Sequence, residues 1–437
     1  MLKRTHYTNE LKDNVGKTVV LSGWVHDCRT LGGINFVLLR DRGGISQVVV
    51  KGKSSEKLIE IVKGLHQEDV ISVKGKVVKS KSTKSRVEII PDEIEIVNKA
   101  QVSLPIDPRQ VTKANLDTRL DWRSLDLRNP KNLAIFTIQS KIVEGMEEYL
   151  REKGFIQVFT PSLLGGMSES GSEVFPVVYF NKQAYLRQDP QLHRELLIAA
   201  GFDKIFDTGP SWRAEKSHTI RHLTEHRTIA PEIAFIKDEN DVIRVEEGLV
   251  ISALKKIKKE CGEQLELLGK KITIPKTPFP ELRFPKIYDI LEKLGKKIPF
   301  GQDYDRESEE LLGKYVKKKY KTDFLFVNRF PFAAKPFYVM RVDEEPIWAR
   351  SIDLIFKGVE QSSGGQREHR YEKIIQQLKE KKMNIESMKW FTEVFKYGVP
   401  SMGGFSIGIE RFTHQLLDLD NIREAVLFTR DPERLVP

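Results

Sequence analysis

The first hundred residues carry the pattern that most restricts how this chain can fold, a series of short apolar runs separated by turn residues. The five runs are residues 17–29, 34–44, 46–52, 69–80 and 86–97. They are rich in valine and isoleucine, and several alternate apolar with polar residues, which is typical of β-strands. One stretch of helical character, residues 54–65, lies between the third and fourth runs. The series therefore predicts a small β-barrel.

The place of that helix favours one kind of barrel. Five strands with a helix between the third and the fourth match the Greek-key barrel called the OB-fold, which often binds oligonucleotides. The strand pattern alone also fits a generic small β-barrel. We assign residues 1–103 to an OB-fold domain.

The charge of the chain indicates an anionic partner. The formal net charge is +10, and nucleic acid is the first candidate partner of a basic protein. A basic surface that only keeps the protein soluble explains this charge equally well. Because 437 residues are enough for two or three domains, the barrel leaves room for a much larger second domain.

Cysteine usage and hydropathy predict where the protein resides. Cys28 and Cys261 lie far apart and have no metal-ligand spacing, so we expect no disulfide and a reducing compartment. The N-terminal residues lack the apolar core of a signal peptide, and no window approaches the apolar length of a membrane span. We expect a cytoplasmic protein.

The chain after the barrel divides into three parts by composition. Residues 104–132 are rich in Pro, Asp and Arg without a long periodic stretch, which predicts a structured hinge. Residues 134–153 have apolar side chains at helical spacing, and the helix should stop at Gly154, before a strand over 155–161. Within 133–437, a lysine-rich helical insertion is expected at about 240–320, where the lysine runs predict solvated helix faces.

Two basic segments suit a strand-loop-strand that grips a nucleoside triphosphate, residues 212–215 (WRAE) and 221–225 (RHLTE). When ATP activates a carboxylic acid, the carboxylate must approach the α-phosphate against charge repulsion. A planar guanidinium can bind both groups at once, which makes Arg213 the candidate. Glu215 would bind the adenine amino group or orient Arg213, and Arg221 with His222 would hold the outer phosphates. Taken alone, an Arg-x-Glu is equally a surface ion pair.

A glycine-rich strand further along the chain, residues 403–411 (GGFSIGIER), ends in an arginine that opens a helix. Its glycines let the backbone pass close beneath a nucleotide. Arg411 would then face the adenine ring or the γ-phosphate. In isolation, the same arginine fits a helix-start residue paired with a surface acid.

Magnesium requires hard oxygen ligands beside the phosphates. Asp353, Glu360 and Ser363 supply such oxygens, on a segment that continues into a glycine pair and Arg367. An acidic strand with a glycine turn is the alternative explanation.

These segments, in this order, resemble motifs 2 and 3 of the class II aminoacyl-tRNA synthetases. The whole chain resembles the archaeal and eukaryotic type of aspartyl-tRNA synthetase in class IIb. Residues 168–176 (SESGSEVFP) resemble the loop that closes over the amino acid. Residues 188–195 (QDPQLHRE) resemble the family's QSPQLYKQ, and 359–369 (VEQSSGGQREH) its VEISSGGQREH. The helix and strand around Gly154 resemble motif 1, which builds a dimer interface.

The resemblance implies an α+β chain, with an anticodon-binding OB-fold and a catalytic domain whose antiparallel sheet is flanked by helices. It implies ATP and Mg²⁺ as cofactors, tRNA and L-aspartate as partners, and a homodimer with Pro161 at the interface. The implied catalytic and ATP-binding residues are Arg213, Glu215, Arg221, His222, Leu223, Glu360, Gly408 and Arg411.

The resemblance also assigns the amino acid and the anticodon. Glu169 would bind the α-ammonium group, with Gln191 near it, and Arg367 would pair with the side-chain carboxylate. Arg194, Arg213 and Ser363 complete the amino-acid site. In the barrel, Phe36 and Gln47 match the stacking aromatic and the polar reader of the central anticodon base, with Arg29 beside them, as expected for single-stranded RNA.

Four positions depart from the family. Arg194 stands where the family has lysine, Asp189 replaces a serine, Ala230 replaces an acid, and His226 takes the place of an aromatic ring that stacks on adenine. We hypothesise that the acid gained at 189 offsets the acid lost at 230, which leaves a similar net charge for the α-ammonium group.

The resulting prediction is an aspartate–tRNA ligase that charges tRNA(Asp). Whether it also charges tRNA(Asn) is open, because that choice depends on barrel loops near His26 and Lys84. An asparaginyl-tRNA synthetase is the nearest competitor, but two cationic residues, Arg194 and Arg367, favour a carboxylate over a neutral amide. An amide-forming synthetase has no use for an anticodon reader. A non-catalytic RNA-binding paralogue would not need the ATP-site residues.

Overall fold

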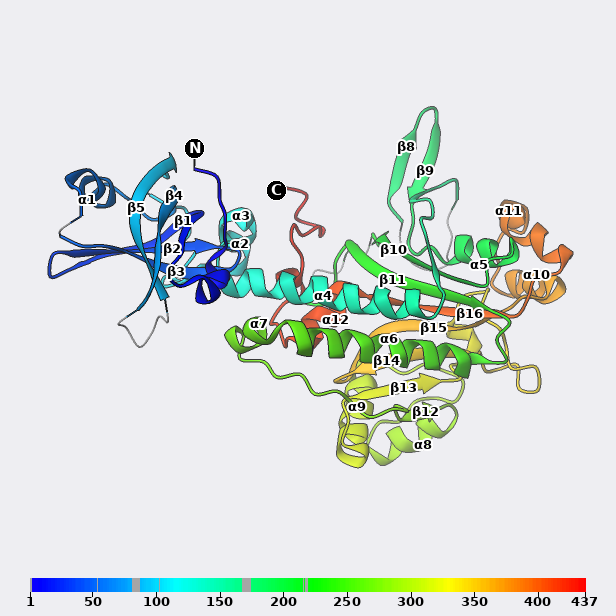
Figure 1. Cartoon of the computed structure of the whole chain (residues 1–437). Coiled ribbons are helices and arrows are strands. Elements are labelled where there is room, and N and C mark those ends of the chain that lie inside the picture. The colour runs from blue at the N-terminus through cyan, green and yellow to red at the C-terminus, as the bar shows by residue number, and fades with distance from the viewer. Residues whose placement is uncertain are drawn as a thin grey trace. The chain divides into compact units, whose positions relative to one another are not determined.

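The computed structural model describes residues 2–52, 54–80, 87–101, 103–166, 174–214, 216 and 219–437. The chain divides into two compact units, Met1–Leu133 and Ala134–Pro437 (Figure 1). Over the described residues, no helix has the length and apolar character required to cross a membrane. Both cysteines are free thiols.

The first unit contains a closed five-stranded barrel with the strand order β1-β2-β3-β5-β4. Its elements are η1 (Thr8–Asn14), β1 (Thr18–Leu31), β2 (Ile34–Asp41), β3 (Gly44–Val50), α1 (Glu56–Lys63), β4 (Val70–Lys79) and β5 (Val87–Asn98). Among the described strand pairs of the barrel, β3–β5 is parallel and the others are antiparallel. The five predicted strands and the helix between the third and fourth are confirmed.

Alternation along the strands explains why this sheet closes on itself. In β1 and β2, Val19, Leu21, Val37 and Leu39 are at most 1% exposed, whereas their neighbours point outward. Because successive side chains of a strand face opposite sides, one side fills the barrel interior with aliphatic groups. The other side is left free to carry polar and aromatic residues.

The segment between the barrel and the second unit forms two short helices, α2 (Leu116–Asp121) and α3 (Arg123–Asp126). Arg128, just after α3, donates to Glu68 of the barrel at 2.9 Å. Arg40 donates to both oxygens of the same carboxylate, at 2.9 and 2.7 Å. Two cations on one buried carboxylate fix this segment to the barrel, and together they make one compact unit.

The second unit is built on an eight-stranded sheet with the order β12-β13-β14-β15-β16-β11-β10-β6. Its strands are β6 (Ile156–Val158), β10 (Lys204–Trp212), β11 (Glu225–Ala234), β12 (Glu281–Arg283), β13 (Phe324–Asn328), β14 (Ser351–Phe356), β15 (Val359–Arg367) and β16 (Met402–Gly408). The interior pairs are antiparallel, and the two edge pairs, β6–β10 and β12–β13, are parallel.

Long helices form the layer that buries one face of this sheet (Figure 1). The described α-helices from Pro130 onward are α4 (Pro130–Glu152, most of which lies in the second unit), α5 (Gln191–Ala199), α6 (Glu239–Glu260), α7 (Gly262–Leu267), α8 (Lys286–Lys293), α9 (Arg306–Tyr320), α10 (Tyr371–Glu380), α11 (Lys389–Thr392) and α12 (Ile409–Leu416). The helix predicted over 134–153 is confirmed within α4, because Ile138, Ile142 and Met146 are fully buried at helical spacing.

The segment 240–320 is mostly helical but is not separate from the sheet. Strand β12 lies within it and forms one edge of the sheet, while α6 packs against β14, β15 and β16. Val316 of α9 is fully buried beside a run of exposed lysines. This region therefore contributes to the core of the unit.

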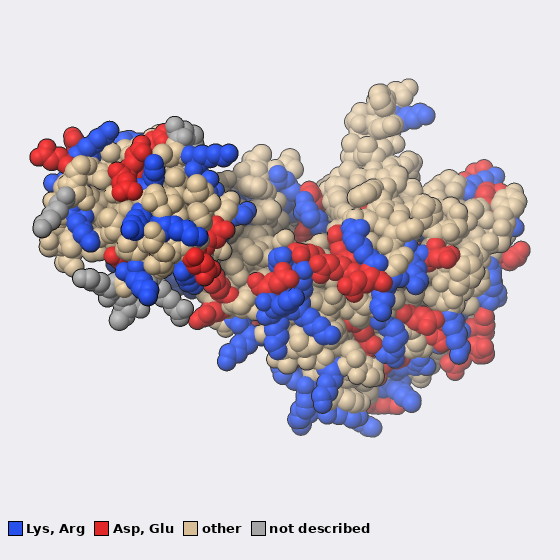
Figure 2. All heavy atoms as spheres, in the orientation of Figure 1, with Lys and Arg blue, Asp and Glu red and all other residues tan. Residues whose placement is uncertain are grey.

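A small sheet of order β7-β9-β8 stands apart from the main one, with β7 at Leu163–Leu164, β8 at Pro176–Tyr179 and β9 at Lys182–Leu186. Its hairpin projects from the unit (Figure 1) and shows few charged side chains in Figure 2. Val178 and Phe180 at the tip are 88% and 86% exposed. Elsewhere in that view, Lys and Arg are interspersed with Asp and Glu.

Candidate active site

A cavity of about 270 Å³ lies in the second unit, over the centre of the main sheet. Strands β11, β15 and β16 and helices α5 and α12 contribute to its wall, as do the loop after β10 and residues 335–339. Predicted site residues that line it are Gln191, Arg194, Arg213, Arg221, His222, Leu223, Glu360, Ser363, Arg367, Gly408 and Arg411. The fold thus gathers into one cavity residues that are up to 220 positions apart in sequence.

Four other predicted residues are not among the described residues that line the cavity. Glu169 and Glu215 lie outside the described residues, as does Lys84. Asp353 is 4% exposed and is absent from the described residues that line the cavity; its oxygens accept hydrogen bonds from Lys335 at 3.1 and 3.3 Å. Burial raises the pKa of Asp353 to about 6, and Lys335 opposes that rise.

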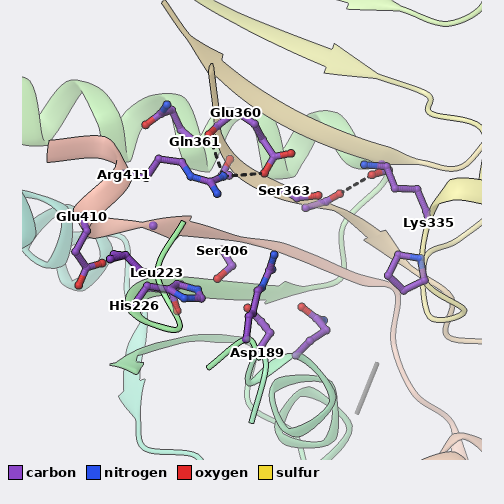
Figure 3. Close-up of a pocket in the computed structure, with 18 of the residues that line it drawn as sticks. Asp189, Leu223, His226, Lys335, Glu360, Gln361, Ser363, Ser406, Glu410 and Arg411 are labelled. Carbon is purple, nitrogen blue, oxygen red and sulfur yellow. Dashed lines mark hydrogen bonds and ion pairs between the residues drawn. The ribbon is translucent and has the colours of Figure 1, made fainter. Parts of the chain in front are cut away.

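One end of the cavity joins Arg411 of α12 to Glu360 of β15. The Arg411 guanidinium donates to the carbonyl oxygen and to a carboxylate oxygen of Glu360, both at 3.2 Å (Figure 3). Glu360 and Ser363 are three residues apart, a spacing that puts side chains on opposite faces of a regular strand. The register of β14 and β15 shifts between these positions, and this bulge lets both side chains face the cavity.

Strand β11 contributes His226 and Thr228 to the cavity wall. Ala230 and Glu232 follow on the same face of the strand, since alternate residues of a strand point to one side. Burial, with the charges of Arg213 and Arg411, lowers the pKa of His226 to about 3. The imidazole is therefore neutral and offers a ring face without adding a positive charge. Ala230 is fully buried, so the acid that the family places there has no polar substitute at this position.

The closed end of the cavity holds two buried arginines. Arg194 and Arg367 are 0% and 3% exposed, and both meet the fully buried Glu232. The Nε of Arg367 donates to Glu232 at 2.9 Å, and the Nε of Arg194 lies 3.5 Å from the same carboxylate. Gly404, opposite Glu232 in the sheet, makes room for this carboxylate, since a Cβ there would lie 2.4 Å from its oxygen.

Gln191 links the two arginines, because its carbonyl oxygen accepts from Arg367 at 2.8 Å and also from Arg194. Arg194 further donates to Asp189 at 3.2 Å. Helical geometry explains the grouping: Gln191 and Arg194 are three residues apart on α5 and share one face. The result is a dense, mostly buried charge network around one small volume.

Sequence reasoning missed three members of the site. Glu232 and Lys335 pair with predicted residues that are 135 and 18 positions away in sequence, so no local pattern reveals them. Glu195, whose carboxylate accepts from Gln191 at 2.8 Å, could have been found. It stands where the family segment QSPQLYKQ ends in glutamine.

The residues present fit a magnesium ion bound together with phosphates. Within the described part of the chain, no group of three or more His, Cys, Asp or Glu side chains is arranged to hold a metal. Magnesium keeps several waters and takes only one or two protein carboxylates when it binds with phosphates. Glu360 and Ser363 both line the cavity and suit that role, whereas Asp353 is already engaged with Lys335.

The barrel brings its three predicted residues onto one outer face. Phe36 lies opposite Arg29 on β1 and opposite Val49 on β3, and Gln47 is two residues from Val49. Directly opposed residues and residues two apart share a face. The Nε2 of Gln47 is 3.5 Å from Glu88, and Arg29 is paired with Asp27 at 2.8 Å. An aromatic ring, an amide and a guanidinium are thus neighbours on this surface.

Comparison with known families agrees with both units. The family described as tRNA synthetases class II (D, K and N) matches residues 115–432, and the OB-fold nucleic acid binding domain matches residues 19–97. The chain therefore belongs to the class II aminoacyl-tRNA synthetases of this group. The predicted family and fold class are confirmed.

Individual relatives match over the full length. The aspartate–tRNA(Asp) ligase of Pyrococcus furiosus is 45% identical over 436 residues, covering 99% of this chain and 100% of the relative. The aspartate–tRNA(Asp/Asn) ligase of Methanopyrus kandleri is 40% identical and covers 100% of both chains. Among solved structures, asparaginyl-tRNA synthetase from Pyrococcus horikoshii complexed with asparaginyl-adenylate superposes with a TM-score of 0.92, at 30% identity and with 100% of both chains covered.

Proposed function

We propose that this protein is an aspartate–tRNA ligase, which activates L-aspartate with ATP and transfers it to tRNA(Asp). The observation that carries the proposal is the charge of the closed end of the cavity. Arg194 and Arg367 are balanced there by Glu232 and Asp189. The charges of the α-ammonium and the side-chain carboxylate of aspartate also sum to zero. Aspartate can therefore form ion pairs with these site residues without leaving a net charge buried in the cavity.

Asparagine fits this charge pattern less well. Its side chain is neutral, so its ammonium would bring a positive charge that nothing on the substrate side chain offsets. The overall fold does not separate the two activities, because structures with either specificity share it. Full-length relatives named as aspartate–tRNA ligases support the same choice.

In the first step, an oxygen of the aspartate α-carboxylate attacks the α-phosphorus of ATP, and pyrophosphate leaves. We assign Arg213 to bridge the carboxylate and the α-phosphate, and Arg221, His222 and Arg411 to the outer phosphates. Glu360 and Ser363 would hold Mg²⁺, which neutralises phosphate charge when bound. His226, being neutral, would lie against the adenine ring. These groups position the reactants and stabilise charge, and no side chain need act as an obligate general base.

In the second step, the hydroxyl of the terminal adenosine of tRNA attacks the carbonyl carbon of aspartyl-adenylate, and AMP leaves. The outer barrel face with Phe36, Gln47 and Arg29 would read the anticodon. The relative from M. kandleri carries tRNA(Asp/Asn) in its name, so we extend the proposal to tRNA(Asn) as a second acceptor.

Pyrophosphate exchange tests the amino acid. With each of the twenty amino acids and ATP, exchange of labelled pyrophosphate is expected with aspartate. Exchange with none, or with asparagine only, contradicts the proposal. Aspartylation of tRNA(Asp) and tRNA(Asn) transcripts, compared side by side, then decides the tRNA specificity.

We expect Asp189→Ser to raise the KM for aspartate about tenfold or more, since a charge-assisted hydrogen bond contributes about 1.5–3 kcal/mol. The reason is that Asp189, 13% exposed in its side chain and lining the cavity, would bind the substrate ammonium in place of the acid missing at 230. The measurement is pyrophosphate exchange at varied aspartate concentration. An unchanged KM rejects this role, and a lower KM would mean that Asp189 competes with the substrate carboxylate for Arg194.

We expect Phe36→Ala to weaken tRNA charging while leaving amino acid activation intact. Loss of one stacked base costs about 1–3 kcal/mol, or about tenfold to a hundredfold in the KM for tRNA. Phe36→Tyr keeps the ring and should stay close to the wild type. Equal losses in pyrophosphate exchange and aminoacylation would show a folding defect instead and would contradict an anticodon role.

The proposal includes a homodimer and cytoplasmic location. Support for the dimer comes from apolar side chains around β6 and β7: Phe159 is 81% exposed, Ile156 54% and Leu163 44%. Exposed apolar residues gathered in this way are typical of protein interfaces. A single monomeric mass in solution at micromolar concentration would contradict this part.

A further inference from the structure

A buried carboxyl group lies directly behind the amino-acid end of the cavity. Glu195 of α5 is 0% exposed and is not among the described residues that line the cavity. One of its oxygens accepts from Nε2 of Gln191 at 2.8 Å, and the other has no hydrogen-bond partner in the structure. The carbonyl oxygen of Gln191 meanwhile accepts from both Arg194 and Arg367. Glu195 thus fixes which end of the Gln191 amide faces the two arginines.

The charge of Glu195 decides the charge of the closed end. With Glu195 neutral, the cations Arg194 and Arg367 are balanced by Glu232 and Asp189. This neutral set complements aspartate, whose ammonium and side-chain carboxylate also cancel. With Glu195 ionised, one negative charge is left over, and that set complements asparagine, which brings an ammonium and a neutral amide.

Three charged groups face Glu195, and they come from three elements. Arg367 of β15, Glu232 of β11 and Arg194 of α5 itself all act on it. Burial is the main reason that the pKa of Glu195 is raised to about 8. Glu232 acts in the same direction, and Arg367, the Gln191 hydrogen bond and Arg194 oppose the rise. At neutral pH, the neutral acid is therefore the main form.

We propose that Glu195, held as a neutral acid, is a positioning and specificity-determining residue for aspartate. It accepts the Gln191 amide and so directs the Gln191 carbonyl oxygen at Arg194 and Arg367, without adding a negative charge beside the substrate carboxylate. Its ionisation shifts the site from aspartate towards asparagine. The inference rests on the proposed function, since it assigns a role in binding the same amino acid.

Linkage gives the direction of the pH effect. If aspartate binds better when Glu195 is neutral, aspartate must in turn favour the neutral form, so binding at alkaline pH takes up a proton. Affinity for aspartate is then full below pH 8 and falls as the pH rises above it. Asparagine, with a neutral side chain, lacks this penalty.

Glu195→Gln tests the proposal, because glutamine keeps the shape and the accepting oxygen but is neutral at every pH. The KM for aspartate, from pyrophosphate exchange at pH 7 and pH 9, is expected to rise about tenfold in the wild type for a group titrating near pH 8. In Glu195→Gln, the KM should change between these pH values only because the α-ammonium group of aspartate titrates. This contribution is the same for the wild type and the variant. The ratio of aspartate to asparagine activation should fall with pH in the wild type alone.

Glu246→Gln is the matched control. Glu246 of α6 is another fully buried acid with a pKa raised to about 8 by burial. It accepts a hydrogen bond from Ser362 and is not among the described residues that line the cavity. This variant should keep the wild-type dependence of KM on pH. The proposal is overturned if the KM for aspartate depends on pH in the same way in the wild type and in Glu195→Gln. It is also overturned if Glu246→Gln reduces this pH dependence as much as Glu195→Gln does.

Proton uptake provides a second readout that does not need a folded variant. Calorimetry of aspartate binding at pH 8.5, in two buffers with different ionisation enthalpies, should show net uptake by the wild type, and no uptake overturns the inference. If the wild type activates aspartate but binds it without pH-dependent proton uptake, the proposed function stands and only the role of Glu195 is rejected. A wild type that activates no aspartate at any pH overturns both.

Discussion

Replacing Arg367 by glutamine is expected to lower kcat/KM for aspartate activation by about 10²- to 10⁴-fold, since breaking a buried ion pair costs about 3–5 kcal/mol. Arg367 is 3% exposed and binds Glu232, Gln191 and the Gly404 carbonyl at once. Its loss leaves Glu232 with a single cation, Arg194, at 3.5 Å. The closed end then carries a net negative charge, which repels the substrate carboxylate.

The matched control for this variant is Arg370→Gln. Arg370 lies three residues further along, is about one-third exposed in its side chain and pairs with Glu368 and Asp343. It is not among the cavity-lining residues of the described chain, so aspartate activation should change by no more than about threefold. Its partner Glu368 is fully buried and loses this cation, so the variant should be less stable. Thermal unfolding of both variants separates stability from binding. Equal activity losses in the two variants would contradict the assignment of Arg367 to the substrate side chain.

The selectivity of the Arg367 variant carries further information. Because the variant has lost a positive charge, aspartate should suffer more than asparagine, whose amide does not need a cation. The ratio of the two kcat/KM values, measured by pyrophosphate exchange, should therefore move towards asparagine. A uniform loss for both amino acids would place Arg367 in general support of the cavity rather than in side-chain recognition.

Local sequence patterns predict much of this molecule. The barrel strands can be read from alternation, and α4 from apolar side chains at helical spacing, because each pattern reports the face that its own element buries. The prediction of Arg213 and Arg411 as ATP-site residues rests on a similar kind of pattern. Each stands at a fixed position after a strand or at the start of a helix, so a short segment of sequence contains both the residue and its context.

Contacts between segments that are distant in sequence could not be predicted from local patterns. Glu232 is recognised as part of the site only through Arg367, 135 residues away. Glu360 and Ser363 share a face only because β15 carries a bulge against β14. Asp353 was predicted as a metal ligand from its oxygen chemistry, but the fold buries it and pairs it with Lys335. Protonation is equally hidden, since the neutral state of Glu195 arises from burial.

Replacing Arg213 by alanine is expected to reduce kcat for adenylate formation by about 10²- to 10³-fold, the usual cost of removing one transition-state charge contact. Arg213 lines the cavity just after β10, with its backbone held by the Thr224 carbonyl at 3.0 Å. Its proposed contact bridges the attacking carboxylate and the α-phosphate, and the charge there develops only as the bond forms. The loss should therefore appear in kcat more than in KM.

Arg227→Ala is the comparison that makes this result decisive. Arg227 stands on the strand that follows the same loop, and its side chain is 51% exposed and paired with Glu225 and Glu410. Its anchoring bond to Glu410 comes from the backbone nitrogen and survives the substitution. Single-turnover formation of aspartyl-adenylate should change by no more than about threefold in this variant. Arg213→Lys should lie between the two, because it keeps the charge and loses the planar fork. If Arg213→Ala is no slower than Arg227→Ala, the carboxylate–phosphate bridge is wrong.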